Sequence, residues 1–446
     1  MSLPRYAEYK ESGVAWLGEV PTHWSIVPLG TLSTSIQTGP FGSQLHSEDY
    51  VDDETPVINP SNIQNGKLVA DASCTVPAHV VERLSEHKLF TGDIVFARRG
   101  EMGRCAMVTT SEAGWICGTG SLNVRLGDKA LPEFVSDFLG TPHVKELLKL
   151  ESVGSTMDNL NTAILSHVQV PTPPIEEQSA IAAFLDRETG KIDALIAEQE
   201  KLLTLLAEKR QATISHAVTR GLNPNAPMKD SGVPWLGDVP AHWDVCPLKY
   251  ISRIGNGSTP NRDNPGYWNE SGFPWLNSSV VNQDEVTEAE RFVTELALKE
   301  CHLPVVQPPA VLVGITGQGK TRGMAAPLLF EATINQHLAY IKPERGQLQV
   351  AYLLRAMEMA YEHLRVDSES AGSTKGAITC DQLSRFAIPL PPLDEQDAIA
   401  SHLDVKAAQF DRLASDSRQT IILLKERRSA LIAAAVTGKI DVRQAA

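Results

Sequence analysis

The chain has 446 residues, of which 42% are hydrophobic and 21% charged, and its formal net charge at pH 7 is −14. This length suggests about three domains, and the composition is that of an ordinary globular protein, not of a disordered or fibrous one. The negative charge argues against a uniformly basic nucleic-acid binder. Any such binding must come from local patches, or from a partner that supplies positive charge.

Several other classes of protein are disfavoured by what the sequence lacks. No apolar run approaches the roughly 20 residues of a membrane-spanning helix, and the first residues lack the apolar core of a signal peptide, so we expect a cytoplasmic location. The six cysteines and twelve histidines show no disulfide or zinc-binding spacing. We find no nucleophile elbow, no dinucleotide fingerprint and no methyltransferase Pro-Pro-aromatic motif. We therefore expect no catalytic residues, no metal and no cofactor bound by this chain.

In chain order, the first element is an arm that occurs twice. Ser12–Leu29 reads SGVAWLGEVPTHWSIVPL, and Ser231–Leu248 reads SGVPWLGDVPAHWDVCPL. Four of the seven tryptophans lie in these arms: Trp16, Trp24, Trp235 and Trp243. We expect them to pack on the long helices described below, with contact to a partner protein as the alternative.

Two variable regions, residues 30–170 and 249–388, share a pattern more than a sequence. Each begins with a Gly-rich loop, Gly39–Ser43 or Gly255–Pro260, of the kind that lets backbone approach a ligand closely. Each continues through a short apolar strand, a basic turn and a helical stretch, and each ends with a Gly-Ser-Thr turn and a strand. The helical stretches are predicted at Pro132–Leu150 and Leu348–Leu364. The pattern predicts two domains of mixed α+β structure.

The polar and basic residues of these loops and turns are candidates for contact with DNA. Arg can bind guanine O6 and N7 bidentately and Gln can do so for adenine, while Lys and the amides of Gly and Ser/Thr turns hold phosphates. The alternative for the basic turns is a solvated hairpin. Asn277-Ser278-Ser279 and Asn335-Gln336-His337 could also read bases, but buried strand or turn roles are equally open. The predicted DNA-binding residues are Thr38, Gly39, Phe41, Ser43, Arg98, Arg99, Arg104, Ser155, Thr156, Ser258, Thr259, Gln318, Lys320, Thr321, Arg322, Ser373, Thr374 and Lys375.

The second basic turn also matches a nucleotide-binding pattern. Gly314–Thr321 fits G-x-x-x-x-G-K-[ST] and follows an apolar strand. A phosphate-binding loop must open a helix, and Pro327 falls within the first two turns of any such helix. The first variable region has a basic turn at the same place without the motif. We therefore expect a structural turn here, with NTP hydrolysis as a minor alternative.

Each variable region is followed by a long helical segment that opens with Pro-Pro and acidic residues, 173–219 and 391–437. Apolar residues at the 3-4 spacing of a coiled-coil seam are Ile192, Leu195, Leu202, Leu206, Phe410, Leu413 and Leu424, with Gln199, Ser417 and Thr420 as polar members. Such helices make rods of roughly 60 to 65 Å unless Gly190 divides the first.

The whole chain is therefore a duplication of arm, globular domain and long helix. By this symmetry we expect the first arm to pack where the second long helix ends. The predicted boundaries of arm, domain and long helix are 1–29, 30–170 and 171–222 in the first copy, and 223–248, 249–388 and 389–446 in the second.

The twofold plan, the arm pattern W-L-G-[ED]-V-P-x-H-W and the helix entry P-x-P-P-[IL]-x-E-Q-x-A-I-A resemble the specificity subunit of type I restriction-modification enzymes. The resemblance covers essentially the whole chain. It implies a non-catalytic DNA-reading subunit with two target-recognition domains, each reading one half of a split DNA target, and an antiparallel pair of long helices that sets the spacer.

The resemblance also implies partners for the chain. These are double-stranded DNA, two methylation subunits that use S-adenosylmethionine, and restriction subunits that use ATP and magnesium. The alternative is a duplicated scaffold that binds only proteins. Replacing Arg98 and Arg104 with Ala should abolish recognition of one half-site in the first case and change nothing in the second.

Overall fold

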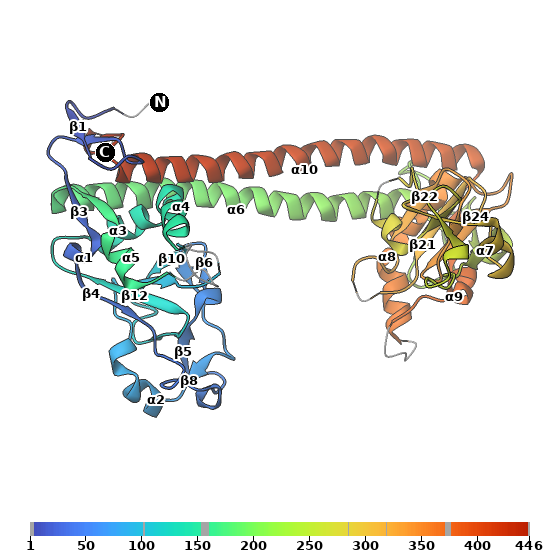
Figure 1. Cartoon of the computed structure of the whole chain (residues 1–446). Helices are drawn as coiled ribbons and strands as arrows, with labels where there is room; N and C mark the ends of the chain where they lie inside the picture. Colours follow the sequence, from blue (N-terminus) through green and yellow to red (C-terminus); the bar gives the residue numbers. More distant parts are fainter. Residues whose placement is uncertain are drawn as a thin grey trace. The chain divides into compact units, whose positions relative to one another are not determined.

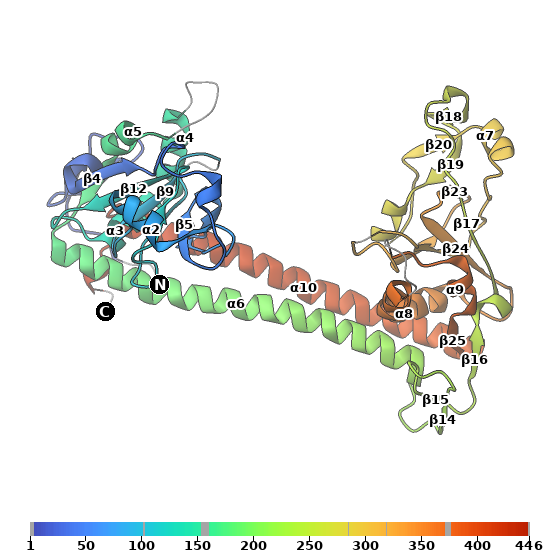
Figure 2. The same ribbon diagram turned by 90° about the horizontal axis from the view of Figure 1, so that it is seen from below.

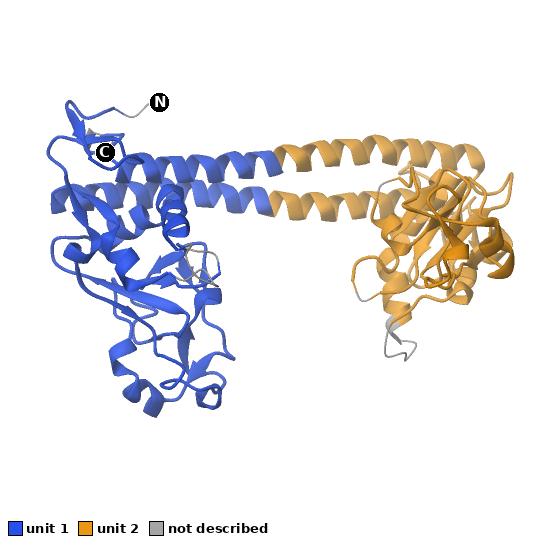
Figure 3. Cartoon of the chain, viewed as in Figure 1, with its two compact units in different colours: residues 1–200, 418–446 blue, residues 201–417 orange. Residues whose placement is uncertain are grey.

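The computed structural model describes residues 4–100, 103–152, 160–283, 285–317, 319–370 and 376–444. Its chain folds into two compact units, residues 1–200 with 418–446 and residues 201–417 (Figures 1 and 3). Each unit contains one mixed domain and parts of both long helices. Within the described residues, no helix combines the length and apolar composition needed to cross a bilayer.

The domain of the first unit is built on a four-stranded antiparallel sheet in the order β10-β9-β12-β4. Its strands are β4 (Ser33–Thr38), β9 (Ile94–Ala97), β10 (Cys105–Met107) and β12 (Ser121–Leu126). Both faces of β9 are buried: Ile94 and Phe96 pack into a core with the helices, while Val95 and Ala97 pack into a second cluster. A strand covered on both faces reads as one apolar run, which is how it appears in the sequence.

A second, smaller sheet of this domain has the order β11-β5-β8. Its strands are β5 (Thr55–Ile58), β8 (Thr75–Val76) and β11 (Ile116–Cys117), and β5 pairs in parallel with β11. The remaining elements of the domain are α1 (Leu29–Leu32), η1 (Ser47–Asp49), η2 (Pro60–Asn62), β6 (Ile63–Gln64), β7 (Lys67–Leu68), α2 (Ala78–Arg83), η3 (Ser85–His87), α3 (Pro132–Leu139), α4 (Pro142–Glu151) and α5 (Thr162–His167).

The second unit repeats this plan. Its sheets are β17-β24-β21-β22 and β18-β20-β19-β23, and again a parallel pair, β19 with β23, occurs in the second sheet (Figure 2). The bounds are η4 (Leu248–Tyr250), β17 (Ser252–Asn256), η5 (Pro265–Tyr267), β18 (Trp268–Asn269), β19 (Phe273–Leu276), η6 (Ser278–Asn282), β20 (Arg291–Val293), α7 (Glu295–Glu300), β21 (Ala310–Gly314), β22 (Ala325–Leu328), β23 (Thr333–Ile334), β24 (Leu338–Pro343), α8 (Val350–Ser370) and α9 (Cys380–Arg385). The predicted α+β class is confirmed in both units.

The long helices are α6 (Ile175–Arg220) and α10 (Leu393–Val436), and α6 runs through Gly190 without a break. In the first unit Arg428 of α10 forms an ion pair with Asp193 of α6 at 2.8 Å, and in the second Arg210 pairs with Asp411 at 2.5 Å. From the first ion pair to the second, the residue number rises in α6, from 193 to 210, and falls in α10, from 428 to 411. The two helices are therefore antiparallel.

The predicted seam is partly wrong. Ile192 is buried, but Leu195 and Leu202 of α6 and Leu413 of α10 are exposed. The seam position that follows Ile192 is occupied by Ile196, which is 9% exposed. Because Leu195 and Ile196 are adjacent and both apolar, the sequence allowed either of them to occupy the seam. The structure buries Ile196 and not the predicted Leu195. In α10, Ser417 is buried, whereas Thr420 is exposed.

The arms explain the Glu-Gln pair that follows each Pro-Pro. Trp24 is fully buried, and its Nε1 donates a hydrogen bond to Glu177 Oε1 at 3.1 Å. Trp243 is also fully buried and donates to Glu395 Oε2 at 2.9 Å. The histidine before each tryptophan contacts the same carboxylate. Each arm is thus fixed to the first turn of the long helix that follows its own domain.

The glutamine of each pair fixes the domain to the same turn. Gln178 Nε2 donates to Lys129 O and Pro173 O, and its Oε1 accepts from Leu131 N. Gln396 repeats the three contacts with the corresponding residues, Gln347, Pro391 and Gln349. The helix-entry motif is therefore conserved between the copies because it satisfies backbone groups at a three-way junction.

Each arm also packs against the end of the other copy's long helix, as predicted. In the first unit Lys439 Nζ, just beyond α10, donates to Glu19 O at 2.6 Å, and Tyr9 OH donates to Gly438 O at 3.1 Å. In the second unit Trp243 packs in one cluster with Val218, near the end of α6. The arm strands are β1 (Tyr9–Glu11), β2 (Glu19–Pro21), β3 (Ser25–Pro28), β14 (Met228–Asp230), β15 (Asp238–Pro240) and β16 (Asp244–Pro247); β3 and β16 pair with β13 (Gln169–Thr172) and β25 (Ala387–Leu390), and η7 (Val442–Gln444) lies near the C-terminus.

The other two arm tryptophans contact aromatic side chains of the domains. Trp16 contacts Phe138 with ring centroids 6.0 Å apart, and Trp235 stacks on Phe386 at 4.9 Å. The hydrogen bonds of Trp24 to Glu177 and of Trp243 to Glu395 confirm the expected packing on the long helices for these two tryptophans.

Candidate nucleic-acid interface

In the first unit, two segments that the sequence singled out, the Gly-rich loop and the basic turn, meet at one end of the four-stranded sheet. The Gly-rich loop joins the start of β12 through Gly39 N, which donates to Ser121 O at 2.9 Å. The basic turn joins the same place through Arg98 N, which donates to Gly120 O at 3.0 Å. The backbone N–H of Leu160, the first described residue after Gly154-Ser155-Thr156, donates to Arg98 O at 3.0 Å. Residues far apart in the sequence thereby form one surface.

The second unit has the same junction. Gly257 N donates to Asn335 O at 3.3 Å, and Ile315 N donates to His337 O at 2.9 Å. Ile378 N donates to Ile315 O at 2.8 Å, in the place that Leu160 occupies in the first unit. The repeat of backbone contacts shows that the two variable regions are copies of one scaffold with different side chains.

The glycines of the Gly-rich loops serve the scaffold. A Cβ atom on Gly39 would collide with the carbonyl oxygen of Gly118, and one on Gly257 would collide with that of Ile334. The close approach that we expected toward a ligand is made toward the protein's own backbone. Gly39 is therefore better explained by packing than by contact with DNA.

The other predicted residues of the first Gly-rich loop differ in exposure. Thr38, at the end of β4, is half-buried, whereas Phe41 is 60% exposed and Ser43 is exposed. An aromatic side chain left this open on a loop has no packing role within the described chain. Phe41 and Ser43 are thus free to contact a partner molecule.

Two arginines of the first basic turn are half-buried and contact backbone carbonyls, and the third is exposed. Arg98 is half-buried, and its Nε donates to Leu160 O at 3.1 Å. Arg104 is half-buried as well, and its Nη1 lies 3.4 Å from Ile63 O. Arg99 is exposed. Arg99 is therefore the arginine of this turn best placed to reach a phosphate or a base.

In the second unit, Ser258 O accepts a hydrogen bond from Trp275 Nε1 at 3.1 Å, which fixes the loop that carries Thr259. Lys320 is exposed, and its turn is held by Tyr361 of α8, whose hydroxyl donates to Lys320 O at 2.8 Å. Arg322 is only 3% exposed and lies against Gly376. A guanidinium this buried does not reach a base, so the expectation for Arg322 is corrected to a structural role.

Six predicted residues lie outside the described part of the chain: Ser155, Thr156, Gln318, Ser373, Thr374 and Lys375.

The nucleotide-binding pattern at Gly314–Thr321 proves to be a strand connection. The next regular element is β22, which pairs antiparallel with β21, and Gly323 N donates to Gly314 O at 2.7 Å. No helix N-terminus follows the loop, so the amides that would hold phosphates are missing. The expectation of a structural turn is confirmed and the NTPase alternative is wrong. The corresponding β9–β10 connection of the first unit is also a hairpin.

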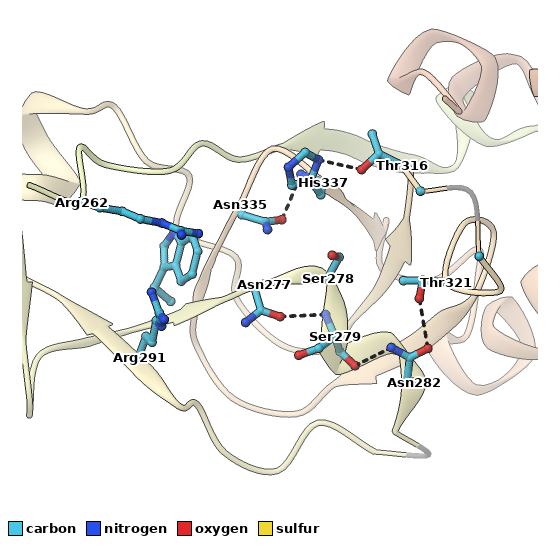
Figure 4. Close-up of a pocket in the computed structure, with 13 residues that line it drawn as sticks. Arg262, Asn277, Ser278, Ser279, Asn282, Arg291, Thr316, Thr321, Asn335 and His337 are labelled. Atoms are coloured by element: carbon cyan, nitrogen blue, oxygen red, sulfur yellow. Dashed lines mark hydrogen bonds between the residues drawn. The ribbon is translucent and has the colours of Figure 1, made fainter. Parts of the chain in front are cut away.

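An open cavity of about 480 Å³ lies at the junction in the second unit (Figure 4). Side chains that can form hydrogen bonds predominate in it. The residues that line it are Arg262, Trp275, Asn277, Ser278, Ser279, Asn282, Arg291, Thr316, Gly317, Gly319, Thr321, Asn335 and His337. They come from the β17–β18 loop, β19, η6 and the residue before it, β20, the β21–β22 turn and the β23–β24 loop.

Two arginines of this cavity, Arg262 and Arg291, were not predicted. They lie on one side of it (Figure 4). Neither belongs to a Gly-rich or basic turn, so no local signal distinguished them from other surface arginines. Only the fold, which places the β17–β18 loop beside β20, brings their charges together.

The asparagines of the cavity organise turns. Asn277 Oδ1 accepts from Ser279 N at 2.7 Å and caps η6, and Asn335, 4% exposed, accepts from His337 N at 2.9 Å. Gln336 and His337 are exposed. Of the alternatives left open by the sequence, turn-forming roles therefore apply to the asparagines, and the side chains available to a ligand are those that follow Asn335.

Comparison with known proteins agrees with this architecture. Residues 21–204 and 240–421 both match the family described as type I restriction modification DNA specificity domain. The chain belongs to this family and contains two copies of the domain. It is a specificity subunit of a type I restriction-modification system, and such subunits are non-catalytic parts of multisubunit enzymes.

Relatives of the full length share the same plan. The chain is 23% identical over 444 residues to the type I restriction enzyme EcoKI specificity subunit of Escherichia coli, covering 96% of this chain and 91% of that protein. A chain from a structure on complex assembly and conformational transition of the type I R-M system matches with a TM-score of 0.70 at 21% identity, covering 94% of this chain and 98% of that one. The HsdS subunit from Thermoanaerobacter tengcongensis matches with a TM-score of 0.53 at 21% identity and the same coverages.

Proposed function

We propose that each of the two domains reads one half of a split double-stranded DNA target through the loops that meet at the end of its four-stranded sheet. The observation that carries this is the cavity of the second unit, in which hydrogen-bonding side chains are combined with Arg262 and Arg291. Hydrogen-bonding groups suit base edges, and arginines suit phosphates or guanine. Because the loops of the two domains carry different side chains on one scaffold, the two half-sites should differ.

We propose that the long helices set the spacer between the half-sites. The helix α6 is continuous over 46 residues. At a rise of 1.5 Å per residue this is a rod of about 70 Å, which is close to two turns of B-DNA. A rod without a break supports a fixed spacer.

Two methylation subunits are proposed to dock on the long helices, and restriction subunits to join that assembly. Exposed leucines on these helices support the docking: Leu195, Leu202 and Leu205 of α6 and Leu413 and Leu423 of α10 are each 39% to 54% exposed. Leucine side chains on a helix surface lose contact with water when a partner helix covers them. S-adenosylmethionine and ATP with magnesium would then be bound by the partners and not by this chain.

Sequencing of methylated adenines tests the proposal. We would compare a host that carries this chain and its methylation subunit with the same host after deletion of the chain. A motif of two different half-sites around a fixed unspecified spacer, present only with the chain, is the expected result. An active methylation subunit with no such motif would leave only the protein-binding scaffold.

A further inference from the structure

Beside the cavity of the second unit, four side chains from three separate loops form a row of hydrogen bonds. Thr259 Oγ1 donates to Gln336 Oε1 at 2.6 Å. Gln336 Nε2 lies 3.3 Å from His337 Nε2, and His337 Nδ1 lies 2.6 Å from Thr316 Oγ1 (Figure 4 shows the last pair). The side chain of Gln336 is exposed at its outer edge and held at both polar atoms.

The direction of these hydrogen bonds follows from the chemistry of the amide. An amide nitrogen only donates, so Gln336 Nε2 requires His337 Nε2 to carry a lone pair. The neutral imidazole then has its proton on Nδ1, which donates to Thr316 Oγ1. Each bond supports the next, and the row holds the Gln336 amide at both its oxygen and its nitrogen.

A fixed amide offers a defined pattern to a ligand. The oxygen of a glutamine has two lone pairs and its nitrogen has two protons. The protein uses one of each on Gln336, which leaves one acceptor and one donor on the same amide group. In the DNA major groove, adenine presents the complementary pair, since its N6 amino group donates and its N7 accepts. Guanine presents two acceptors there, cytosine a donor alone and thymine an acceptor beside a methyl group.

We infer that Gln336 reads an adenine in the half-site bound by the second unit, and that Thr259, His337 and Thr316 are positioning residues that hold its amide in the reading orientation. This inference rests on the proposed function. It adds the base and the residue that selects it, and it decides the role that the sequence left open for Gln336.

At the corresponding positions of the described β11–β12 loop, the first unit has no glutamine or histidine. Its β11–β12 loop contains Thr119 and Gly120 where the second unit has Gln336 and His337, as the matching backbone bonds of Arg98 and Ile315 establish. Neither residue has a side-chain amide. The adenine contact is therefore specific to one half-site, and the other half-site is an internal control for every variant.

The test uses the complex of the full chain with its methylation subunits and the target identified by adenine-methylation sequencing. Binding to duplexes substituted one base pair at a time would be measured for the wild type and for Gln336→Glu. Glutamate keeps the shape but only accepts, so it loses the bond to N7 and matches the amino group of cytosine. We expect the wild type to lose about 5- to 150-fold in affinity when one adenine of the second half-site is replaced, and the variant to lose this preference or to favour cytosine.

Positioning is tested by a matched pair of substitutions. Thr259→Val removes the hydroxyl that orients the amide and should weaken the same adenine preference, while Thr259→Ser should keep it. Gln307→Ala is the control, because Gln307 is an exposed glutamine of the same domain that pairs with Glu331 and does not line the cavity.

The outcomes separate the two proposals. If the wild-type complex has a split target and Gln336→Glu shows the same base preference at every position, the reading role of Gln336 is refuted while DNA recognition stands. A wild-type complex without any split target refutes the proposed function itself. A variant that binds all duplexes more weakly still gives a clear result, because base preference is compared among duplexes for the same protein. Its preferences at the first half-site should remain those of the wild type.

Discussion

The two copies of the arm clamp should differ in their contribution to stability. In the first unit Glu177 is 6% exposed and accepts from Trp24 Nε1 at 3.1 Å and from Tyr6 OH at 2.7 Å, with His23 Nε2 at 2.8 Å. In the second unit the side chain of Glu395 is 39% exposed and its donors are the histidine and the tryptophan alone. Burial and the carboxylate of Glu177 together raise the pKa of Tyr6.

We expect Glu177→Gln to cost about 2 to 4 kcal/mol. Hydrogen bonds to a charged group contribute about 1.5 to 3 kcal/mol each, and a buried donor that faces the new amide nitrogen costs a further 1 to 3 kcal/mol, while a neutral amide oxygen retains about half of the original interaction. Glu395→Gln should cost less than about 1 kcal/mol, because water reaches that carboxylate and screens its interactions.

The measurement is hydrogen exchange followed by mass spectrometry, with peptides of the two units read separately, supported by urea unfolding. Glu177→Gln should lower protection in the first unit and leave the second unchanged, and Glu395→Gln should produce the smaller effect in the second. If both variants lose the same protection, or if Glu395→Gln loses more, burial does not control the strength of the clamp.

Three further predictions concern the folded units. Arg125 forms a bidentate ion pair with the buried Asp93, at 2.7 and 2.8 Å, so Arg125→Ala should destabilise the first unit by about 3 to 5 kcal/mol, whereas Arg99→Ala on its exposed turn should change the unfolding midpoint in urea hardly at all. Burial raises the pKa of Asp137 from 3.8 to about 6. Between about pH 4 and 6 the folded state therefore binds a proton that the unfolded state has lost. The free energy of unfolding falls as the pH rises through this range, and the loss is complete above about pH 6. Since Asp137 is half-buried, Asp137→Asn should stabilise by about 1 to 2 kcal/mol at pH 7.5 and by nothing at pH 3.5; equal effects at both pH values in thermal unfolding would contradict this. A circular permutant opened within residues 223–227 and joined at the original termini should fold, because Asp441 N already donates to Pro4 O at 2.8 Å; failure to recover a protein with the wild-type circular dichroism spectrum would contradict the closed arrangement.

The sequence by itself determined the plan of the protein. Two arms, two variable domains and two long helices were visible because repeats and helical periodicity are properties of neighbouring residues. The position of the basic turns as strand connections followed in the same way, since Pro327 argued against a helix. The buried tryptophans of the arms were expected for the same reason.

The tertiary structure alone decided which side chains can meet a ligand. Gly39 was assigned to a ligand but packs on Gly118, and Arg322 was assigned to DNA but is buried. The partners that decide such roles are distant in sequence: Thr259 and Gln336 are 77 residues apart. No local pattern records a contact over that separation. The phase of the helix seam was likewise settled by burial, because apolar residues at both candidate positions, such as Leu195 and Ile196, left the sequence without a preference.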